Sequence, residues 1–149
     1  MIYLTENISL FDFYKNNPHY SLSHCISSDG RMGAGIALEF TKQFPTLRGK
    51  LIKILHHSHV GKMVEYKIPD GSGYIFNLIT KEKYHNKPTY ETVEQSLKDM
   101  YNFCKNNKIQ YLAIPMLGSG LDRLNWYKVE RILKQVFRDL DIKIVMCYI

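Results

Sequence analysis

The chain has 149 residues, 45% of them hydrophobic, which suits a single domain spanning residues 1–149 with its own core. Its formal net charge of +6 suits an anionic partner, although a lysine-rich composition without a dense basic run explains that charge equally well. The three cysteines are odd in number and form no C-x-x-C pair, which disfavours a disulfide framework or zinc ribbon and indicates a reducing compartment.

Strands and helices are predicted to alternate from the start of the chain. Residues 2–5 and 20–26 have the pattern of strands, and the second leads into a loop-like run, SSDGRMGAG. Apolar residues at steps of four predict a helix over 36–44, which Pro45 interrupts before a second helical piece at 47–55.

The second half shows the alternation most clearly. The predicted elements are hairpin strands at 62–68 and 73–80, a helix at 89–105, a buried strand at 111–116, a helix at 125–140 capped by Asn125, and a strand at 142–149. This order indicates a mostly parallel sheet with helices on both faces. Because ligands of such folds sit outside the carboxyl ends of the strands, functional residues are expected just after strands.

Two glycine loops occupy such positions. The first is Arg31-Met32-Gly33-Ala34-Gly35, between a predicted strand and helix, where glycines let backbone N–H groups approach a phosphate and the helix offers its free N–H groups. On its own, this motif fits a simple helix-starting turn equally well. The second loop runs from Pro115 to Asp122, again between strand and helix. Together the two loops are suited to clamp a diphosphate from two sides.

A lysine and an aspartate near these loops suggest chemistry. Lys81 follows the predicted strand 73–80 and points toward the same crevice, unless it is an ordinary surface lysine. Asp122 is the only acid of the second glycine loop, and its position alone favours a helix N-cap. Both residues are expected at the ends of neighbouring strands, facing the distal part of the ligand. As a pair, the carboxylate can orient the lysine, take its proton and later activate water.

Other reactive side chains are expected to be structural. The run His56-His57-Ser58-His59 has no carboxylate or cysteine at ligand spacing, so neither a metal nor another cofactor is predicted. His24 is expected to be a hydrogen-bonded structural histidine, and Cys25 lies in a predicted buried strand without a base. Trp126 and Tyr127, at a helix start, are expected to pack rather than to stack on a ligand.

Five stretches resemble the macrodomain family, in particular the branch of terminal ADP-ribose protein glycohydrolases and O-acetyl-ADP-ribose deacetylases. They are HCIS (24–27), RMGAGIA (31–37), LITK (78–81), NKPTY (86–90) and GSGLDRL (118–124). The resemblance covers about residues 20–149. It implies an α/β fold, a three-layer αβα sandwich around a mixed, mostly parallel sheet, with ADP-ribose bound in a cleft at the crest of the sheet.

The resemblance also implies roles for individual residues. Lys81 would be the nucleophile and Asp122 the acid/base residue. The residues that would contact the substrate are Asn7, Ile8, Ser27, Gly33, Ala34, Gly35, Met116, Leu117, Gly118, Ser119, Gly120, Leu121 and Ile149. Asn7 stands where the family usually has an aspartate that accepts the adenine amino group. An asparagine oxygen can accept the same bond without a charge.

The function implied is that of an ADP-ribosyl hydrolase, which releases ADP-ribose from an acidic side chain, a nucleobase or an O-acyl ester and so reverses mono-ADP-ribosylation in DNA damage or toxin defence. A non-catalytic ADP-ribose reader and an ADP-ribose 1″-phosphatase remain alternatives. The expected partners are ADP-ribose and ADP-ribosylated protein, nucleic acid or small ester, bound by a monomer. No apolar run approaches the roughly 20 residues of a membrane span and the first residues lack signal-peptide features, so no membrane association and a cytosolic or nuclear location are expected.

Overall fold

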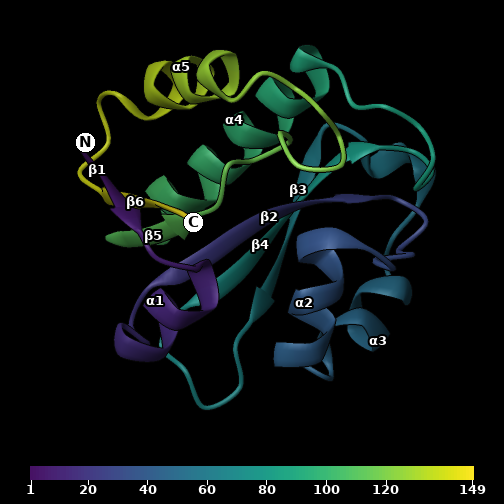
Figure 1. Cartoon of the computed structure of the whole chain (residues 1–149), viewed down its shortest axis with the longest axis horizontal. Helices are drawn as coiled ribbons and strands as arrows, with labels where there is room; N and C mark the ends of the chain where they lie inside the picture. Colours follow the sequence, from purple (N-terminus) through teal and green to yellow (C-terminus); the bar gives the residue numbers. More distant parts are fainter.

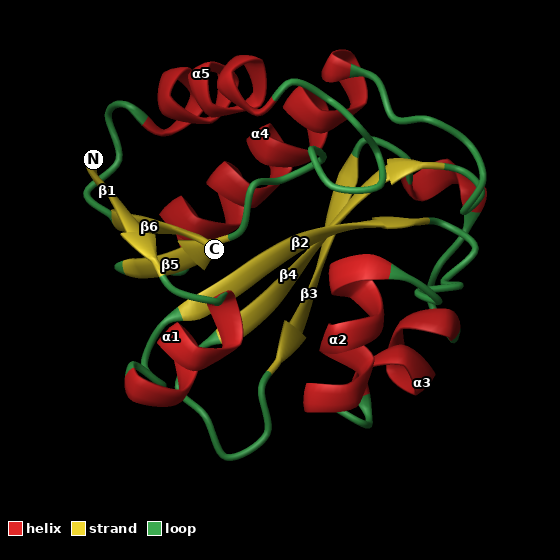
Figure 2. Cartoon of the chain, viewed as in Figure 1, coloured by secondary structure: helices red, strands yellow, loops and turns green.

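Six strands form one mixed sheet in the order β1-β6-β5-β2-β4-β3, seen in Figure 1 and by element type in Figure 2. The computed structural model describes residues 1–149. The strands are β1 (Ile2–Asn7), β2 (Ser21–Ser27), β3 (Lys62–Lys67), β4 (Tyr74–Lys81), β5 (Tyr111–Ile114) and β6 (Lys143–Tyr148). Strand β3 pairs with β4 antiparallel, and the other pairs are parallel. The predicted mixed, mostly parallel sheet is therefore confirmed.

The central strands are buried on both faces because helices cover both. Successive side chains of a strand point to opposite faces, and here they enter two different cores. In β4, Phe76 and Leu78 belong to one core, whereas Ile75 and Ile79 belong to the other. In β5, Leu112 lies in the first core. This two-sided burial explains why β4 is apolar from Tyr74 to Ile79 except at Asn77.

Five helices form the two outer layers (Figure 1). On one face lie α1 (Leu10–Asn16), α2 (Gly35–Gln43) and α3 (Leu47–Ile52), and on the other α4 (Tyr90–Asn106) and α5 (Trp126–Phe137). A short 3-10 helix, η1 (His57–His59), precedes β3. The result is a three-layer αβα arrangement. None of the helices combines the length and apolarity that crossing a membrane requires.

Two local predictions need correction. Helix α1 has no counterpart among the predicted elements, although Ser9 caps it by accepting the Asp12 backbone N–H, and it buries Leu10 and Phe13. Seven residues span only two turns, too few for a helical period to stand out in the sequence. The second helical piece ends at Ile52 rather than residue 55, since the chain there leaves the helix toward η1.

Candidate functional site

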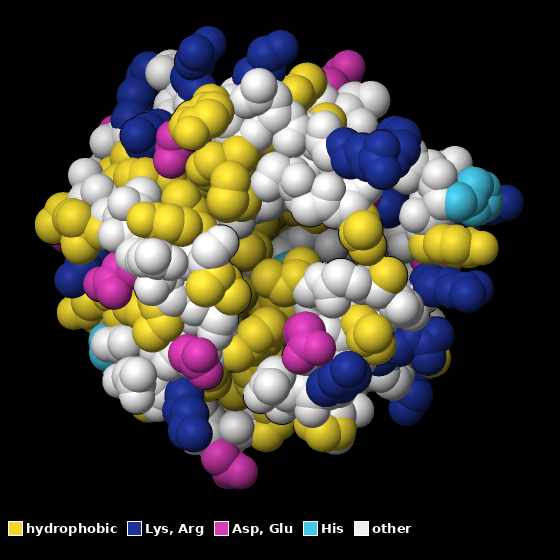
Figure 3. Space-filling model, viewed as in Figure 1, with side chains coloured by type: hydrophobic (Ala, Val, Ile, Leu, Met, Phe, Trp, Pro, Cys, Tyr) yellow, Lys and Arg dark blue, Asp and Glu magenta, His cyan; other side chains and the backbone are white.

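A cleft of about 1060 Å³ lies at the carboxyl ends of β2, β4 and β5. Most of the predicted site residues line it, namely Ser27, Gly33, Ala34, Gly35, Lys81, Met116, Leu117, Gly118, Ser119, Gly120, Leu121 and Asp122. Figure 3 shows this face of the molecule hollowed near its middle, with Lys and Arg side chains on its right side and along its upper left edge. The expectation that functional residues follow parallel strands therefore agrees with the position of the cleft.

The first glycine loop presents an uncapped helix start to the cleft. Helix α2 begins at Gly35, and its N-cap residue Ala34 makes no side-chain hydrogen bond to the helix. The N–H groups of the first turn are therefore left without a side-chain partner, an arrangement that favours an anion. The carbonyls of Gly30 and Arg31 both accept hydrogen bonds from Arg48 Nε of α3, which anchors the loop to that helix.

The second glycine loop folds back on itself before α5. Gly118 adopts a φ of +71°, a left-handed conformation that favours glycine, and its carbonyl accepts the Leu124 backbone N–H at 2.8 Å. Asn125 caps α5 by accepting the Lys128 backbone N–H, as predicted. The N-cap alternative for Asp122 is therefore wrong, because that cap is three residues further along the chain.

A β-bulge shapes the end of β4. Ile26 of β2 pairs with Ile79, but the next residue, Ser27, pairs with Lys81, so Thr80 is an extra residue in the ladder. A bulge changes the direction in which the following side chains point. Thr80 is buried, and Lys81 lines the cleft with its side chain only 14% exposed. The alternative that Lys81 is an ordinary surface lysine is therefore wrong.

Lys81 and Asp122 form an ion pair inside the cleft. Lys81 Nζ lies 2.6 Å from Asp122 Oδ1, and the Asp122 side chain is 16% exposed. The two residues were predicted to follow neighbouring strands, which is wrong, because β2 lies between β4 and β5. The folded second glycine loop brings Asp122 to Lys81 instead. A carboxylate at this distance can accept a proton from the amine directly.

Cys25 of β2 lines the same cleft. Burial, followed by the negative charge of Asp122, raises the pKa of the Cys25 thiol to about 12, although a backbone N–H of Gly118 and the Lys81 charge act in the opposite direction. At neutral pH the sulfur therefore remains a thiol, and thiols are much poorer nucleophiles than thiolates. This agrees with the expectation that Cys25 is no nucleophile.

His24 is a structural histidine, as predicted. It is fully buried, Nε2 lies 2.7 Å from Asn77 Oδ1, and its ring stacks on Phe40 with centroids 3.9 Å apart. Burial lowers the pKa of His24 to about 4, against an opposing effect of the Asn77 hydrogen bond. The imidazole is therefore neutral at pH 7 and belongs to the packing beneath α2.

Asp29 joins the first glycine loop to the segment after Lys81. Its carboxylate accepts the Ser27 hydroxyl at 2.5 Å, the Arg31 backbone N–H at 3.0 Å and the Tyr84 backbone N–H at 2.9 Å. Burial alone would raise the pKa of this carboxyl, but these hydrogen bonds and the Arg31 charge outweigh burial and lower it. Ser27, predicted to touch the ligand, thus also holds Asp29.

Three predicted contacts are not brought to the lining of the cleft: Asn7, Ile8 and Ile149. Asn7 ends β1 beside Tyr148 of β6, Ile8 packs against the core under α1, and Ile149 is 95% exposed. Their assignment to the adenine side therefore remains a prediction. All three nevertheless lie at or directly after the carboxyl ends of β1 and β6, at the same edge of the sheet as the cleft.

The sequence interpretation missed one wall of the cleft. Tyr84, His85, Asn86 and Lys87 line it in the segment that follows Lys81, and their position directly after a strand end was the available signal. Trp126 and Tyr127 both line the cleft. Trp126 is buried as predicted, but Tyr127 is 75% exposed, so the packing prediction for Tyr127 is wrong. Adjacent helix positions point about 100° apart, so only one of the two can face the core.

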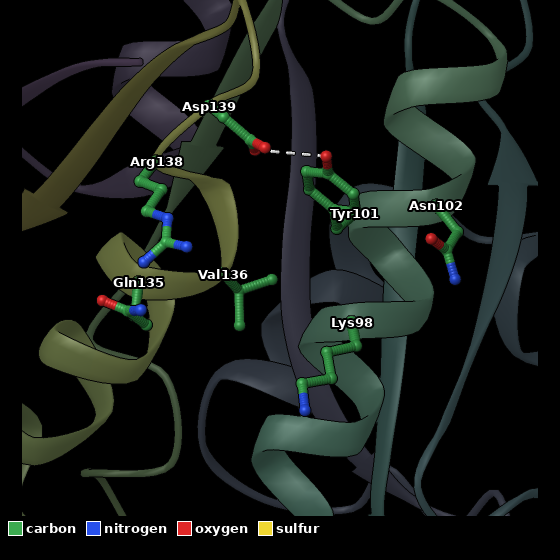
Figure 4. Close-up of a pocket in the computed structure, with 7 residues that line it drawn as sticks. All are labelled: Lys98, Tyr101, Asn102, Gln135, Val136, Arg138 and Asp139. Atoms are coloured by element: carbon green, nitrogen blue, oxygen red, sulfur yellow. Dashed lines mark hydrogen bonds between the residues drawn. The ribbon is translucent and has the colours of Figure 1, made fainter.

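His56, His57 and His59 lie outside this site, as does a second hollow. His59 Nδ1 accepts the His56 backbone N–H, and His56 Nδ1 accepts the Ser58 backbone N–H, so these rings cap η1. No group of three or more His, Cys, Asp or Glu side chains is placed to hold a metal ion. A smaller hollow of about 340 Å³ lies between α4 and α5, where Tyr101 donates to Asp139 (Figure 4).

Comparisons with known proteins agree with this architecture. Residues 24–133 match the Macro domain family. The chain is 43% identical over 126 residues to "ADP-ribose glycohydrolase OARD1" of Homo sapiens, covering 85% of this chain and 80% of that protein. It is 29% identical over 128 residues to the "DNA ADP-ribosyl glycohydrolase" of Thermus aquaticus, covering 83% of this chain and 36% of that longer protein.

Solved structures share the same fold. The "Macrodomain of Mycobacterium tuberculosis DarG" superposes with a TM-score of 0.88 at 24% identity, covering 99% of this chain and 98% of that one. The match extends over the whole sheet and both helical layers. The chain therefore belongs to the macrodomain family.

Proposed function

We propose that this chain is an ADP-ribosyl hydrolase in which Lys81 is the nucleophile and Asp122 the acid/base residue. The observation that carries the proposal is the Lys81–Asp122 ion pair, 2.6 Å long, in a cleft walled by both glycine loops. Its human relative is named an ADP-ribose glycohydrolase and is 43% identical over most of both chains. Membership of the macrodomain family and the close contact between Lys81 and Asp122 together favour a hydrolase over a protein that only binds ADP-ribose.

The two glycine loops are proposed to hold the diphosphate. The uncapped N-terminus of α2 favours negative charge, and the second loop supplies further backbone N–H groups opposite it. The diphosphate then fixes the distal ribose, and its anomeric carbon is placed toward Lys81. Holding the substrate by groups that do not react is what converts its attack into an effectively unimolecular step.

In the first proposed step, Asp122 takes a proton from the Lys81 ammonium. The neutral amine attacks the anomeric carbon of the distal ribose, and the bond from that carbon to the leaving group breaks. The leaving group departs with the bonding electron pair and receives a proton through Asp122. ADP-ribose is then linked covalently to Lys81 through nitrogen.

In the second step, Asp122 acts as a base toward water. Water attacks the same anomeric carbon while the bond to the Lys81 nitrogen breaks. The nitrogen keeps the electron pair and regains a proton, so free ADP-ribose and the original lysine result. Two displacements of this kind split one difficult hydrolysis into two easier steps.

The leaving group is proposed to be an acidic side chain, a nucleobase or an O-acyl group. The name of the Thermus aquaticus relative, a DNA ADP-ribosyl glycohydrolase, supports the inclusion of a nucleobase. The free thiols of Cys25, Cys104 and Cys147 support action in the reducing cytosol or nucleus. We propose that the protein works there as a monomer.

A panel of defined substrates tests this function. It comprises Glu-linked, Ser-linked, thymidine-linked and guanosine-linked ADP-ribose, the acetyl ester, and ADP-ribose 1″-phosphate. Release of ADP-ribose from at least one glycosidic or acyl substrate is expected. Binding without turnover of any of them would identify a reader, and turnover of the phosphate alone would identify a phosphatase.

A further inference from the structure

Residues 84–87 form one wall of the cleft and belong to the segment 82–88, here called the Tyr84 loop, which has no assigned role in the chemistry above. Its tyrosine is 51% exposed and lines the cleft. The loop directly follows Lys81, so whatever occupies the space beside it lies next to the proposed nucleophile. With the ribose held by the glycine loops, that neighbouring space is where a leaving group would lie.

The position of Tyr84 is fixed before any ligand binds. Its backbone N–H donates to Asp29 at 2.9 Å, and the preceding backbone is tied to β2 because Ser28 and Asp29 donate to the carbonyls of Lys81 and Glu82. These bonds involve main-chain atoms of the loop. They hold the loop regardless of the side chain at position 84.

The ring of Tyr84 has one cation already stacked on it. The Arg31 guanidinium lies 4.3 Å from the ring centroid, and His85 meets the ring edge-on at 5.2 Å. Cation–π contact and a fixed backbone orient an aromatic ring that would otherwise rotate in solvent. About half of the residue remains exposed toward the cleft and solvent, so the ring still offers surface for stacking.

The charges around this ring are mostly positive. Lys83 and Lys87 belong to the same loop and Arg31 covers the ring, whereas the acids are Glu82 in the loop and Asp29, which accepts the Tyr84 backbone N–H. Aromatic rings interleaved with cations are the common means of holding an unpaired base together with its phosphates. An acyl group or a carboxylate side chain has no flat ring that could use such a surface.

Resting on the proposed hydrolase function, we propose that Tyr84 is a specificity-determining residue: its ring is a preorganised stacking platform for a planar nucleobase leaving group. Stacking on a ring that is already fixed costs little further ordering. Tyr84 therefore favours base-linked over ester-linked ADP-ribose at the same reactive centre. It takes no part in the bond changes, which stay with Lys81 and Asp122.

The test compares two substrates that share ADP-ribose and the anomeric carbon but differ in leaving group: ADP-ribosylated thymidine in a short single strand, and the acetyl ester. Tyr84→Ala should lower kcat/KM for the thymidine-linked substrate about tenfold or more, the size expected for lost base–aromatic stacking. The same variant should change kcat/KM for the ester by less than about threefold. Tyr84→Phe keeps the ring and should remain near wild type on both.

The outcomes separate this inference from the hydrolase function. Equal losses on both substrates, or no loss on the thymidine-linked one, would overturn the stacking role. Wild-type turnover of the ester without turnover of the thymidine-linked substrate would overturn it while leaving the hydrolase function intact. Wild-type failure on both, and on the wider panel of substrates, would overturn the hydrolase function itself. Tyr84→Leu, which retains apolar bulk without a π face, should behave like Tyr84→Ala if stacking is the cause.

Discussion

Gly35 and Leu121 bring the two glycine loops together across the cleft. A Cβ on Gly35 would lie 3.1 Å from Cδ1 of Leu121, and the φ of Gly35 is +57°. The left-handed conformation favours glycine at this position, and an added Cβ would push the Leu121 side chain aside. By contrast, a Cβ on Gly120 would meet no atom within 4 Å. Gly35 and Gly118 (φ +71°) thus disfavour a side chain through their left-handed conformation, whereas Gly120 is open.

The open position provides a test of diphosphate binding. Gly120→Glu should fold normally, because space for the side chain exists, but should weaken ADP-ribose binding at least about 100-fold through bulk and like charge. Gly120→Ala is the matched control and should bind within about threefold of wild type. Isothermal calorimetry measures both, with thermal unfolding to verify the fold. Absence of binding heat from folded wild-type protein would contradict the binding proposal.

Metal chelation tests whether side chains suffice for catalysis. The proposed steps use only Lys81, Asp122 and water, so kcat should be unchanged after dialysis against EDTA. Turnover is followed by the release of ADP-ribose from an acyl or base-linked substrate. Loss of activity on chelation and its recovery with zinc or magnesium would show that the lysine mechanism is incomplete.

Salt dependence tests whether the net charge of +6 serves substrate binding. If lysines near the cleft contact nucleic-acid phosphates, kcat/KM on an ADP-ribosylated oligonucleotide should fall with salt more steeply than on the acetyl ester, because phosphate contacts release counterions. The two substrates are compared at ionic strengths from about 0.05 to 0.3 M. Equal slopes would mean that the charge reflects composition alone.

Buried His24 should make the protein less stable in mild acid. Its folded pKa of about 4 lies below the ordinary value of 6.5, so the unfolded chain binds more protons between these values. Its contribution to stability is complete above pH 6.5 and is lost as the pH falls toward 4, by roughly 3 kcal/mol in total. Urea unfolding at pH 7.5, 6 and 5 measures this change.

The matched variant for that experiment is His24→Gln, which keeps a group able to hydrogen-bond Asn77 but does not titrate. It should be less stable at pH 7.5, because the stacking on Phe40 is lost. Its stability should then change less between pH 7.5 and 5 than that of the wild type. A parallel pH dependence in the two proteins would assign the effect to other groups.

Much of the fold could be predicted because burial on both faces leaves a strong pattern. Strand β5 is continuously apolar, β4 is apolar from Tyr74 to Ile79 except at Asn77, and α5 carries apolar residues at helical spacing, so their type was clear from the sequence. The order of the strands was not clear, because no local pattern says that β2 lies between β4 and β5. Which strands are adjacent depends on how segments far apart in the sequence pack together. The prediction that Lys81 and Asp122 follow neighbouring strands was wrong for this reason.

The two glycine loops and Lys81 could be predicted because their residues form a recognisable pattern in the sequence. Glycines at 33, 35, 118 and 120 identify both loops, and Lys81 at a strand end identifies the amine. The Tyr84 loop was missed because tyrosine, histidine and lysine have ordinary surface roles in most proteins. Its place in the cleft follows from the backbone hydrogen bonds of Ser28 to Lys81 and of Asp29 to Glu82, both 53 positions apart, and from the bond of the Tyr84 N–H to the Asp29 carboxylate, 55 positions apart.

Intact mass spectrometry of the Asp122→Ala variant, mixed with substrate, tests the central claim most directly. Removing the base should slow the second step at least as much as the first, so ADP-ribose should accumulate on the protein, and peptide sequencing should map it to Lys81. Lys81→Ala should bind ADP-ribose nearly as well as wild type, form no adduct and lose turnover. Wild-type turnover by Lys81→Ala would contradict the mechanism, and loss of binding in that variant would favour a reader in which Lys81 contacts the ligand.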